Sequence, residues 1–130
     1  MRTAAAYSEL AGRLADASGD VIRRHFRDLP DVSDKADASP VTIADQQAEE
    51  VMRALLETRC PDHGILGEEG KSVRQDADYL WVLDPIDGTK NFASGSYQFG
   101  TLISLLLDGA PVLGIIDQPV LGERWFGVAG

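Results

Sequence analysis

The spacing of hydrophobic residues changes once along this chain, near Gly64, and that change limits the folds it can adopt. Before Gly64, apolar residues recur every three or four positions, which is the period of a helix with one buried face. After Gly64, short apolar runs are bounded by turn residues, as in strands. Two helices followed by a mainly antiparallel sheet predict an α+β layered fold.

The boundaries of these elements follow from breakers and turn signals. We expect one helix over roughly Thr3–Arg27 and a second from Thr42 to just before Pro61, with a polar loop between them. Thr42 to Asp45 resembles a capping box at the start of the second helix. The pair Asp108-Gly109 is a strong hairpin signal. The predicted strands are Ile65–Leu66, Tyr79–Leu83, Gly100–Leu107, Pro111–Ile116 and Glu123–Val128.

Composition limits the compartment and the partners. No apolar run approaches the ~20 residues that span a bilayer, and the N-terminus lacks the apolar core of a signal peptide. The single cysteine cannot form an internal disulfide, so we expect a cytoplasmic protein with no membrane partner. A net charge of −9 argues against nucleic acid as a partner. An anionic small substrate remains compatible if divalent cations lie between it and the acids.

Acidic residues stand at the ends of several predicted elements. Asp45 lies in the first turn of the second helix, Glu68 and Glu69 follow one strand, and Asp84 and Asp87 follow the next. We expect short loops at neighbouring strand ends to bring these carboxylates to one place. Hard oxygen ligands suit Mg²⁺, Mn²⁺ or Ca²⁺, and no cluster of cysteine and histidine indicates zinc.

The segment WVLDPIDGTKNF, residues 81–92, begins as a strand and then breaks. Pro85 fixes one φ angle and stiffens the chain between Asp84 and Asp87. Both side chains and the intervening Ile86 carbonyl are then placed to face one cation.

The second part of this segment fits an anion. Gly88 allows the backbone to approach a ligand closely, and residues 88–92 are expected to begin a short helix whose N–H groups bind phosphate oxygens. The Thr89 hydroxyl adds a group that can orient a water molecule. Taken singly, each acid has an ordinary structural explanation, such as a helix-terminal charge for Asp45, so the hypothesis depends on their combination.

Three segments together carry a family resemblance: SPVTIAD (39–45), PDHGILGEE (61–69) and WVLDPIDGTKNF (81–92). In this order and at these separations they resemble the inositol monophosphatase family of Mg²⁺-dependent, lithium-sensitive phosphatases. KADASPVTIAD and GTLISLLLDGAPVLGIIDQPVLGERWFG are most similar to its histidinol-phosphate phosphatase branch.

The resemblance implies a role for each matching residue. The implied metal ligands are Asp45, Glu68, Asp84, Asp87 and the Ile86 carbonyl, holding two or three Mg²⁺ ions, with Mn²⁺ as a substitute. Glu68 and Thr89, with Asp45 behind Thr89, would position and help deprotonate the water that the metal activates. The backbone N–H groups of Gly88 and Thr89 would bind the phosphate. Lys35 and Glu69 would lie near the site.

The implied reaction is hydrolysis of a phosphomonoester of a small metabolite. The branch resemblance favours histidinol phosphate, giving histidinol and phosphate in histidine biosynthesis. The alternatives are inositol 1-phosphate, another sugar or nucleotide phosphate, or a truncated, non-catalytic metal-binding fragment. The family also implies a homodimer.

One family feature has no match in this chain. The family carries a further metal-ligating aspartate in a W-D-x-A-A-G type motif, whereas Trp125 is followed here by Phe126. We therefore expect residues 1–130 to be the N-terminal metal- and phosphate-binding α+β domain of a longer, two-part phosphatase whose second α/β half is absent from this chain.

Overall fold

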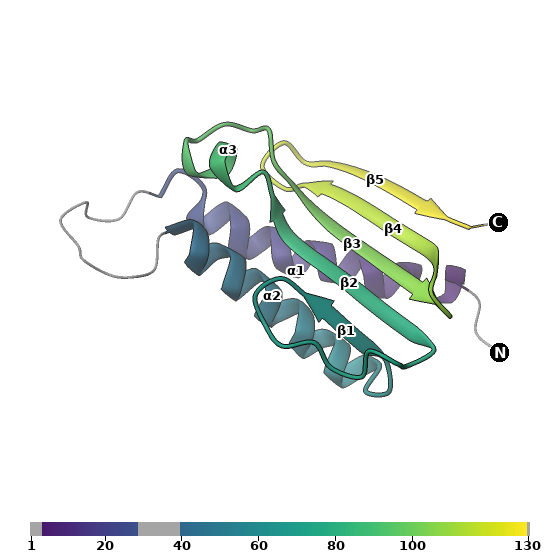
Figure 1. The fold of residues 1–130 in the computed structure, drawn as a ribbon. Helices are drawn as coiled ribbons and strands as arrows, with labels where there is room; N and C mark the ends of the chain where they lie inside the picture. Colours follow the sequence, from purple (N-terminus) through teal and green to yellow (C-terminus); the bar gives the residue numbers. More distant parts are fainter. Residues whose placement is uncertain (1–3, 29–39, 130) are drawn as a thin grey trace.

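The computed structural model describes residues 4–28 and 40–129 of the chain. The predicted α+β class is confirmed, because two long helices pack on one face of a five-stranded sheet (Figure 1). The helices are a 3₁₀ turn η1 (Ala4–Tyr7), α1 (Ser8–His25), α2 (Pro40–Arg59) and the short α3 (Thr89–Ala93). The strands are β1 (Gly64–Gly67), β2 (Tyr79–Asp87), β3 (Gly100–Leu107), β4 (Ala110–Gln118) and β5 (Glu123–Val128).

The sheet is mixed but mostly antiparallel. Its strands lie in sequence order, β1 to β5; β1 runs parallel to β2, and every other neighbouring pair is antiparallel. The predicted hairpin at Asp108-Gly109 joins β3 to β4, and both residues have positive φ angles, 50° and 84°. These angles match the right-handed twist of the flanking strands, which explains why the pair is a strong turn signal.

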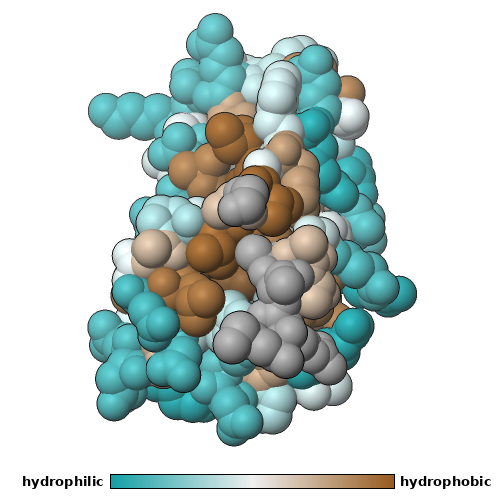
Figure 2. Space-filling model, turned by 90° about the vertical axis from the view of Figure 1, so that its right-hand side faces the viewer, coloured by the Kyte–Doolittle hydropathy of each residue, from teal (hydrophilic) through white to brown (hydrophobic). Residues whose placement is uncertain are grey.

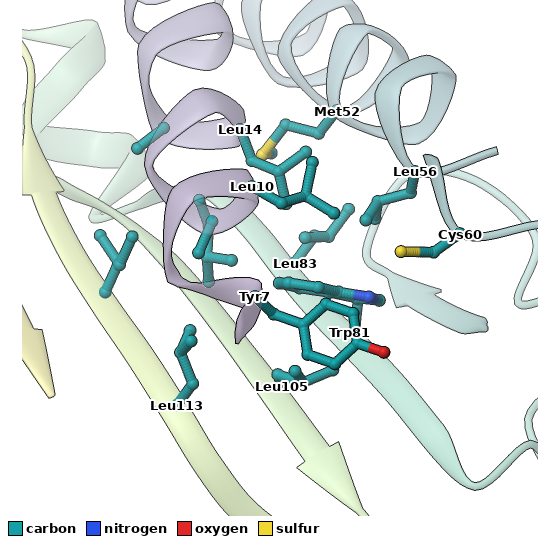
Figure 3. Packing of buried hydrophobic residues seen from close by; sticks show 14 of the residues in the cluster. Tyr7, Leu10, Leu14, Met52, Leu56, Cys60, Trp81, Leu83, Leu105 and Leu113 are labelled. Atoms are coloured by element: carbon teal, nitrogen blue, oxygen red, sulfur yellow. The ribbon is translucent and has the colours of Figure 1, made fainter. Parts of the chain in front are cut away.

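The core lies between the helices and the sheet (Figure 3). Leu14 of α1 and Met52 of α2 are fully buried against Trp81 and Leu83 of β2. Side chains alternate along a strand, so Val82 and Asp84 belong to the opposite face of β2. A well-packed β2 therefore fixes the position from which Asp84 projects.

Two of the predicted boundaries that differ from the structure bear on the acidic residues. The second helix begins at Pro40 rather than Thr42, so Thr42 is not its N-cap and the capping-box prediction fails. Proline is favoured in the first turn of a helix, where its missing N–H costs nothing.

The second wrong boundary is the end of β2, which continues past Leu83 to Asp87. Asp84 and Asp87 therefore lie within the strand rather than after it. Asp84 pairs with Leu102 and Asp87 with Gly100, so three steps on β2 oppose two on β3, as in a β-bulge. We name residues 84–87 the β2 bulge.

The sheet leaves apolar residues exposed at its last strand. Trp125 and Phe126 of β5 are 57% and 45% exposed. Figure 2 shows hydrophobic side chains gathered in a band down one side of the molecule, bordered by hydrophilic residues. Among the residues that the structure describes, no helix is both long and apolar enough to cross a membrane.

Candidate metal centre

The parallel pairing of β1 with β2 brings two of the acidic segments together. Gly67, the last residue of β1, pairs with Leu83, so Glu68 and Asp84 each follow a member of that pair. Glu68 and Glu69 are exposed, whereas Asp84 is half-buried. The parallel pairing thus places the turn after β1, which carries Glu68, beside the part of β2 that carries Asp84.

The third contribution to this cluster comes from the helix layer. Asp45 lies on α2 and is buried, with 6% of its surface exposed. The backbone N–H of Ile86, in the β2 bulge, lies near enough to this carboxylate to stabilise its charged form. Burial is the largest cause that raises the pKa of Asp45 to about 7, followed by the negative charges of Glu69, Asp84 and Glu68, against the lowering effect of the Ile86 backbone N–H.

Asp84 has the same kind of surroundings. Burial is the largest cause that raises its pKa to about 6, followed by the charges of Glu68, Asp87, Glu49 and Glu69. The charges of Glu68 and Glu69, on the turn after β1, therefore raise the pKa both of Asp45 on α2 and of Asp84 on β2.

The donor set fits a hard cation. Asp45 Oδ1 and Asp84 Oδ1 are both buried and have no hydrogen-bond partner among the described residues. Carboxylate and carbonyl oxygens are the ligands that Mg²⁺ prefers. Within residues 4–28 and 40–129, however, no three acidic, histidine or cysteine side chains already meet the geometry of a formed metal site.

The predicted phosphate-binding segment adopts the expected local structure. Gly88 precedes α3 with a φ angle of 96°, which a side chain would disfavour. A Cβ there would lie 2.9 Å from the Gln98 carbonyl oxygen, so space as well as φ requires glycine. Thr89 is the first residue of α3 and is exposed, and the Phe92 N–H donates to the Gly88 carbonyl at 3.0 Å.

A hollow adjoins the acids on the face of the sheet that the helices leave uncovered. Glu68 and Asp84 form its acidic side, and Ser104 adds a hydroxyl. The rest of its lining is apolar or backbone: Leu66, Gly67, Val82, Leu83 and Leu102. The carboxylates thus border a space with one polar and one apolar side.

Glu49 was not among the predicted site residues. This residue lies four positions after Asp45 on α2, is only 2% exposed, and binds the turn that carries Glu68 and Glu69. Its spacing from Asp45, within the apolar face of the helix, could have indicated that it is buried, but not which turn it binds. Lys35, predicted near the site, lies outside the described residues.

Comparison with known proteins agrees with this architecture. The profile of the inositol monophosphatase family matches residues 5–130. An inositol monophosphatase from Zymomonas mobilis superposes with a TM-score of 0.83 at 56% identity, over 95% of this chain and 48% of that one.

Two curated relatives are named as different kinds of phosphatase. The bifunctional phosphatase IMPL2, chloroplastic, of Arabidopsis thaliana is 55% identical over 95% of this chain and 36% of its own length. The histidinol-phosphatase of Mycobacterium tuberculosis is 39% identical over 93% of this chain and 47% of its own length. The chain thus spans less than half the length of these relatives.

Proposed function

Because the chain belongs to the inositol monophosphatase family, we propose that the protein carrying it is an Mg²⁺-dependent phosphoric monoester hydrolase. One observation supports this most strongly. Asp45 and Asp84 come from different layers of the fold, the charge of Asp84 helps to raise the pKa of Asp45, and each presents a buried oxygen without a partner among the described residues. Such a pair suits a divalent cation.

In this proposal the cation is Mg²⁺, two or three ions, with Mn²⁺ as a substitute. The residues that would hold it are Asp45, Glu68, Asp84, Asp87 and the Ile86 carbonyl. When bound, Mg²⁺ lowers the pKa of water and neutralises phosphate charge.

The chain's own residues would supply orientation and proton transfer. Glu68 and the Thr89 hydroxyl would orient the attacking water, with Glu68 accepting its proton and Asp45 supporting Thr89. The N–H groups of Gly88 and Thr89 would donate to the phosphate oxygens, where negative charge develops in the transition state. Glu69 and Lys35 would flank this site.

Two substrates are supported by different relatives. We propose inositol 1-phosphate or a related sugar phosphate first, because the solved structure with 56% identity is an inositol monophosphatase. Histidinol phosphate is the second candidate, because relatives from Mycobacterium tuberculosis and Chlorobaculum parvum, 39% and 40% identical, are histidinol-phosphatases.

The remaining expectations are part of the same proposal. Residues 1–130 would form the metal- and phosphate-binding part of a two-part phosphatase, in keeping with the share of the relatives that they cover. The whole protein would be a cytoplasmic homodimer, although the Arabidopsis relative is chloroplastic.

Phosphate release from a panel of inositol 1-phosphate, histidinol phosphate and a nucleotide phosphate, with Mg²⁺ and with EDTA, tests the proposal. We expect turnover only with Mg²⁺, with loss of at least 100-fold in kcat/KM for Asp84→Asn, because one removed electrostatic contact costs about that much. Exposed Asp76→Asn is the matched control. Mg²⁺ binding without turnover of any substrate would support the non-catalytic alternative.

A further inference from the structure

Glu49 is a buried acid whose carboxylate is aimed at backbone N–H groups rather than at the candidate metal centre. Its Oε1 accepts from the Glu69 N–H at 3.0 Å, and its Oε2 accepts from the Gly70 N–H at 2.7 Å. Both donors belong to the turn that follows β1, which also carries Glu68. One carboxylate therefore binds two successive peptide groups of that turn.

The surrounding residues are fitted to this carboxylate. A Cβ at Gly67 would lie 2.5 Å from the Glu49 Cδ, and one at Gly70 would lie 3.0 Å from its Oε2. A side chain at residue 67 would therefore displace this carboxylate, and one at residue 70 would be a tight fit against it. Arg53 Nε donates to Oε2 at 2.9 Å and offsets the charge of the buried acid.

Helical spacing connects this contact to the metal centre. Asp45 and Glu49 are four residues apart, so they lie on the same face of α2, one turn after the other. Asp45 senses the charge of Glu68, while Glu49 holds the backbone directly after Glu68. The distance between Asp45 and Glu68 is thus set by helix α2, which carries Asp45 and Glu49, and by the Glu49 carboxylate, which holds the turn of Glu68.

We propose that Glu49 is a positioning residue, which fixes residues 67–70 so that the Glu68 carboxylate stands opposite Asp45 and Asp84 before any cation binds. The effect of Glu49 on catalysis rests on the proposed function. Its effect on the position of the turn does not depend on that function. A charge-assisted hydrogen bond is about twice as strong as a neutral one, so a carboxylate with two backbone donors holds a turn more firmly than an amide does.

The test uses the whole natural protein with Glu49→Gln, and exposed Glu50→Gln as the matched control. In the metal-free state we expect amide exchange of Glu69 and Gly70 to accelerate at least 10-fold in Glu49→Gln, because an amide cannot accept both N–H groups. By calorimetry with Mg²⁺ alone, we expect the dissociation constant to rise about 10-fold. Glu50→Gln should change neither quantity.

Activity measurements then distinguish a role of Glu49 in positioning the turn from a general loss of stability in the variant. We expect Glu49→Gln to need about 10-fold more Mg²⁺ for half-maximal rate, with kcat at saturating Mg²⁺ within about 3-fold of the wild type. A loss of thermal stability with unchanged Mg²⁺ affinity and unchanged exchange at Glu69 would overturn the proposal.

Two outcomes keep the inference distinct from the proposed function. If the wild-type protein hydrolyses no substrate, amide exchange and calorimetry still decide the role of Glu49. If Glu49→Gln does not fold, Glu49→Asp carries the test, because it keeps the charge and withdraws the carboxylate by one methylene. Wild-type exchange and Mg²⁺ affinity in Glu49→Asp would then contradict the proposal.

Discussion

At the scale of single residues, the two aspartates with raised pKa values carry the chemical argument. Asp84 titrates near 6 in the folded protein but near 3.8 in an unfolded chain. Between these values the folded state keeps a proton that the unfolded state has lost, so stability falls as pH rises through this window. Above about pH 6 the Asp84 carboxylate is ionised in the folded protein as well, and its burial lowers the free energy of unfolding by the full amount.

Replacing Asp84 by asparagine should therefore stabilise the metal-free protein at pH 8. We expect a gain of about 1–2 kcal/mol, since one unit of pKa corresponds to about 1.4 kcal/mol and partial exposure reduces the total. The gain should vanish near pH 4, close to the ordinary value of 3.8. Urea unfolding with EDTA at the two pH values measures it, and an Asp84→Asn variant less stable than the wild type at pH 8 would refute the electrostatic account.

Thr89 should act in the chemical step rather than in binding. Its hydroxyl lies at the start of α3, where we propose that it orients water, so Thr89→Ala should lower kcat about 10–100-fold while KM changes less than about 3-fold. Steady-state kinetics with saturating Mg²⁺ measure both constants, and Thr89→Ser is the control that keeps the hydroxyl. A raised KM with normal kcat would make Thr89 a binding residue.

The acids near strand ends were predictable from the sequence, whereas the acid that holds a turn was not. Asp84 and Glu68 stand beside Pro85 and Gly67, and such turn residues draw attention to them. Glu49 stands between Ala48 and Glu50 in a helix and has the sequence context of an ordinary polar position. Its role depends on a contact 20 residues away along the chain, which helical spacing alone cannot reveal.

At the scale of elements, the β2 bulge determines where Asp84 and Asp87 project. The buried Thr101 hydroxyl donates to the Pro85 carbonyl at 2.7 Å, and Asp87 pairs with Gly100. Proline provides no N–H for a sheet, so a bulge is one of the few places where a strand tolerates it. The sequence predicted a break after Leu83 because proline and glycine favour turns, but pairing with β3 continues the strand.

Thr101→Val tests this bulge. The valine has nearly the same shape but leaves the Pro85 carbonyl without its buried donor, which should cost about 1–3 kcal/mol of unfolding free energy. Thr101→Ser, which retains the hydroxyl, should lose less. Chemical denaturation measures both variants, and equal stability of Thr101→Val and wild type would show that other contacts hold the bulge.

At the scale of the whole molecule, the order of helices and strands was predictable from the sequence. The strand pairing that brings the acidic residues together was not. The change from helical to strand spacing near Gly64 predicted two helices on a mainly antiparallel sheet, and the structure has that arrangement (Figure 1). The parallel pairing of β1 with β2 was not predicted, because a strand of four residues gives no signal of its direction. That pairing is what places Glu68 beside Asp84.

Lithium inhibition tests family behaviour in the whole natural protein. A monovalent ion that takes one cation position without supplying the charge of Mg²⁺ should slow turnover. We expect inhibition at submillimolar to millimolar lithium, measured by phosphate release against an equal concentration of sodium chloride as the control. Full activity in this range would weaken the assignment of the cation sites.

The central claim is that acids from α2, from the turn after β1 and from β2 surround one cation position. A crystal structure of the whole natural protein grown with Mn²⁺ tests it directly, because anomalous scattering locates the ion. We predict a peak among the carboxylates of Asp45, Glu68 and Asp84, with Asp87 and the Ile86 carbonyl alongside. A saturated crystal without a peak among these residues, or with their side chains directed away from one another, would contradict the account.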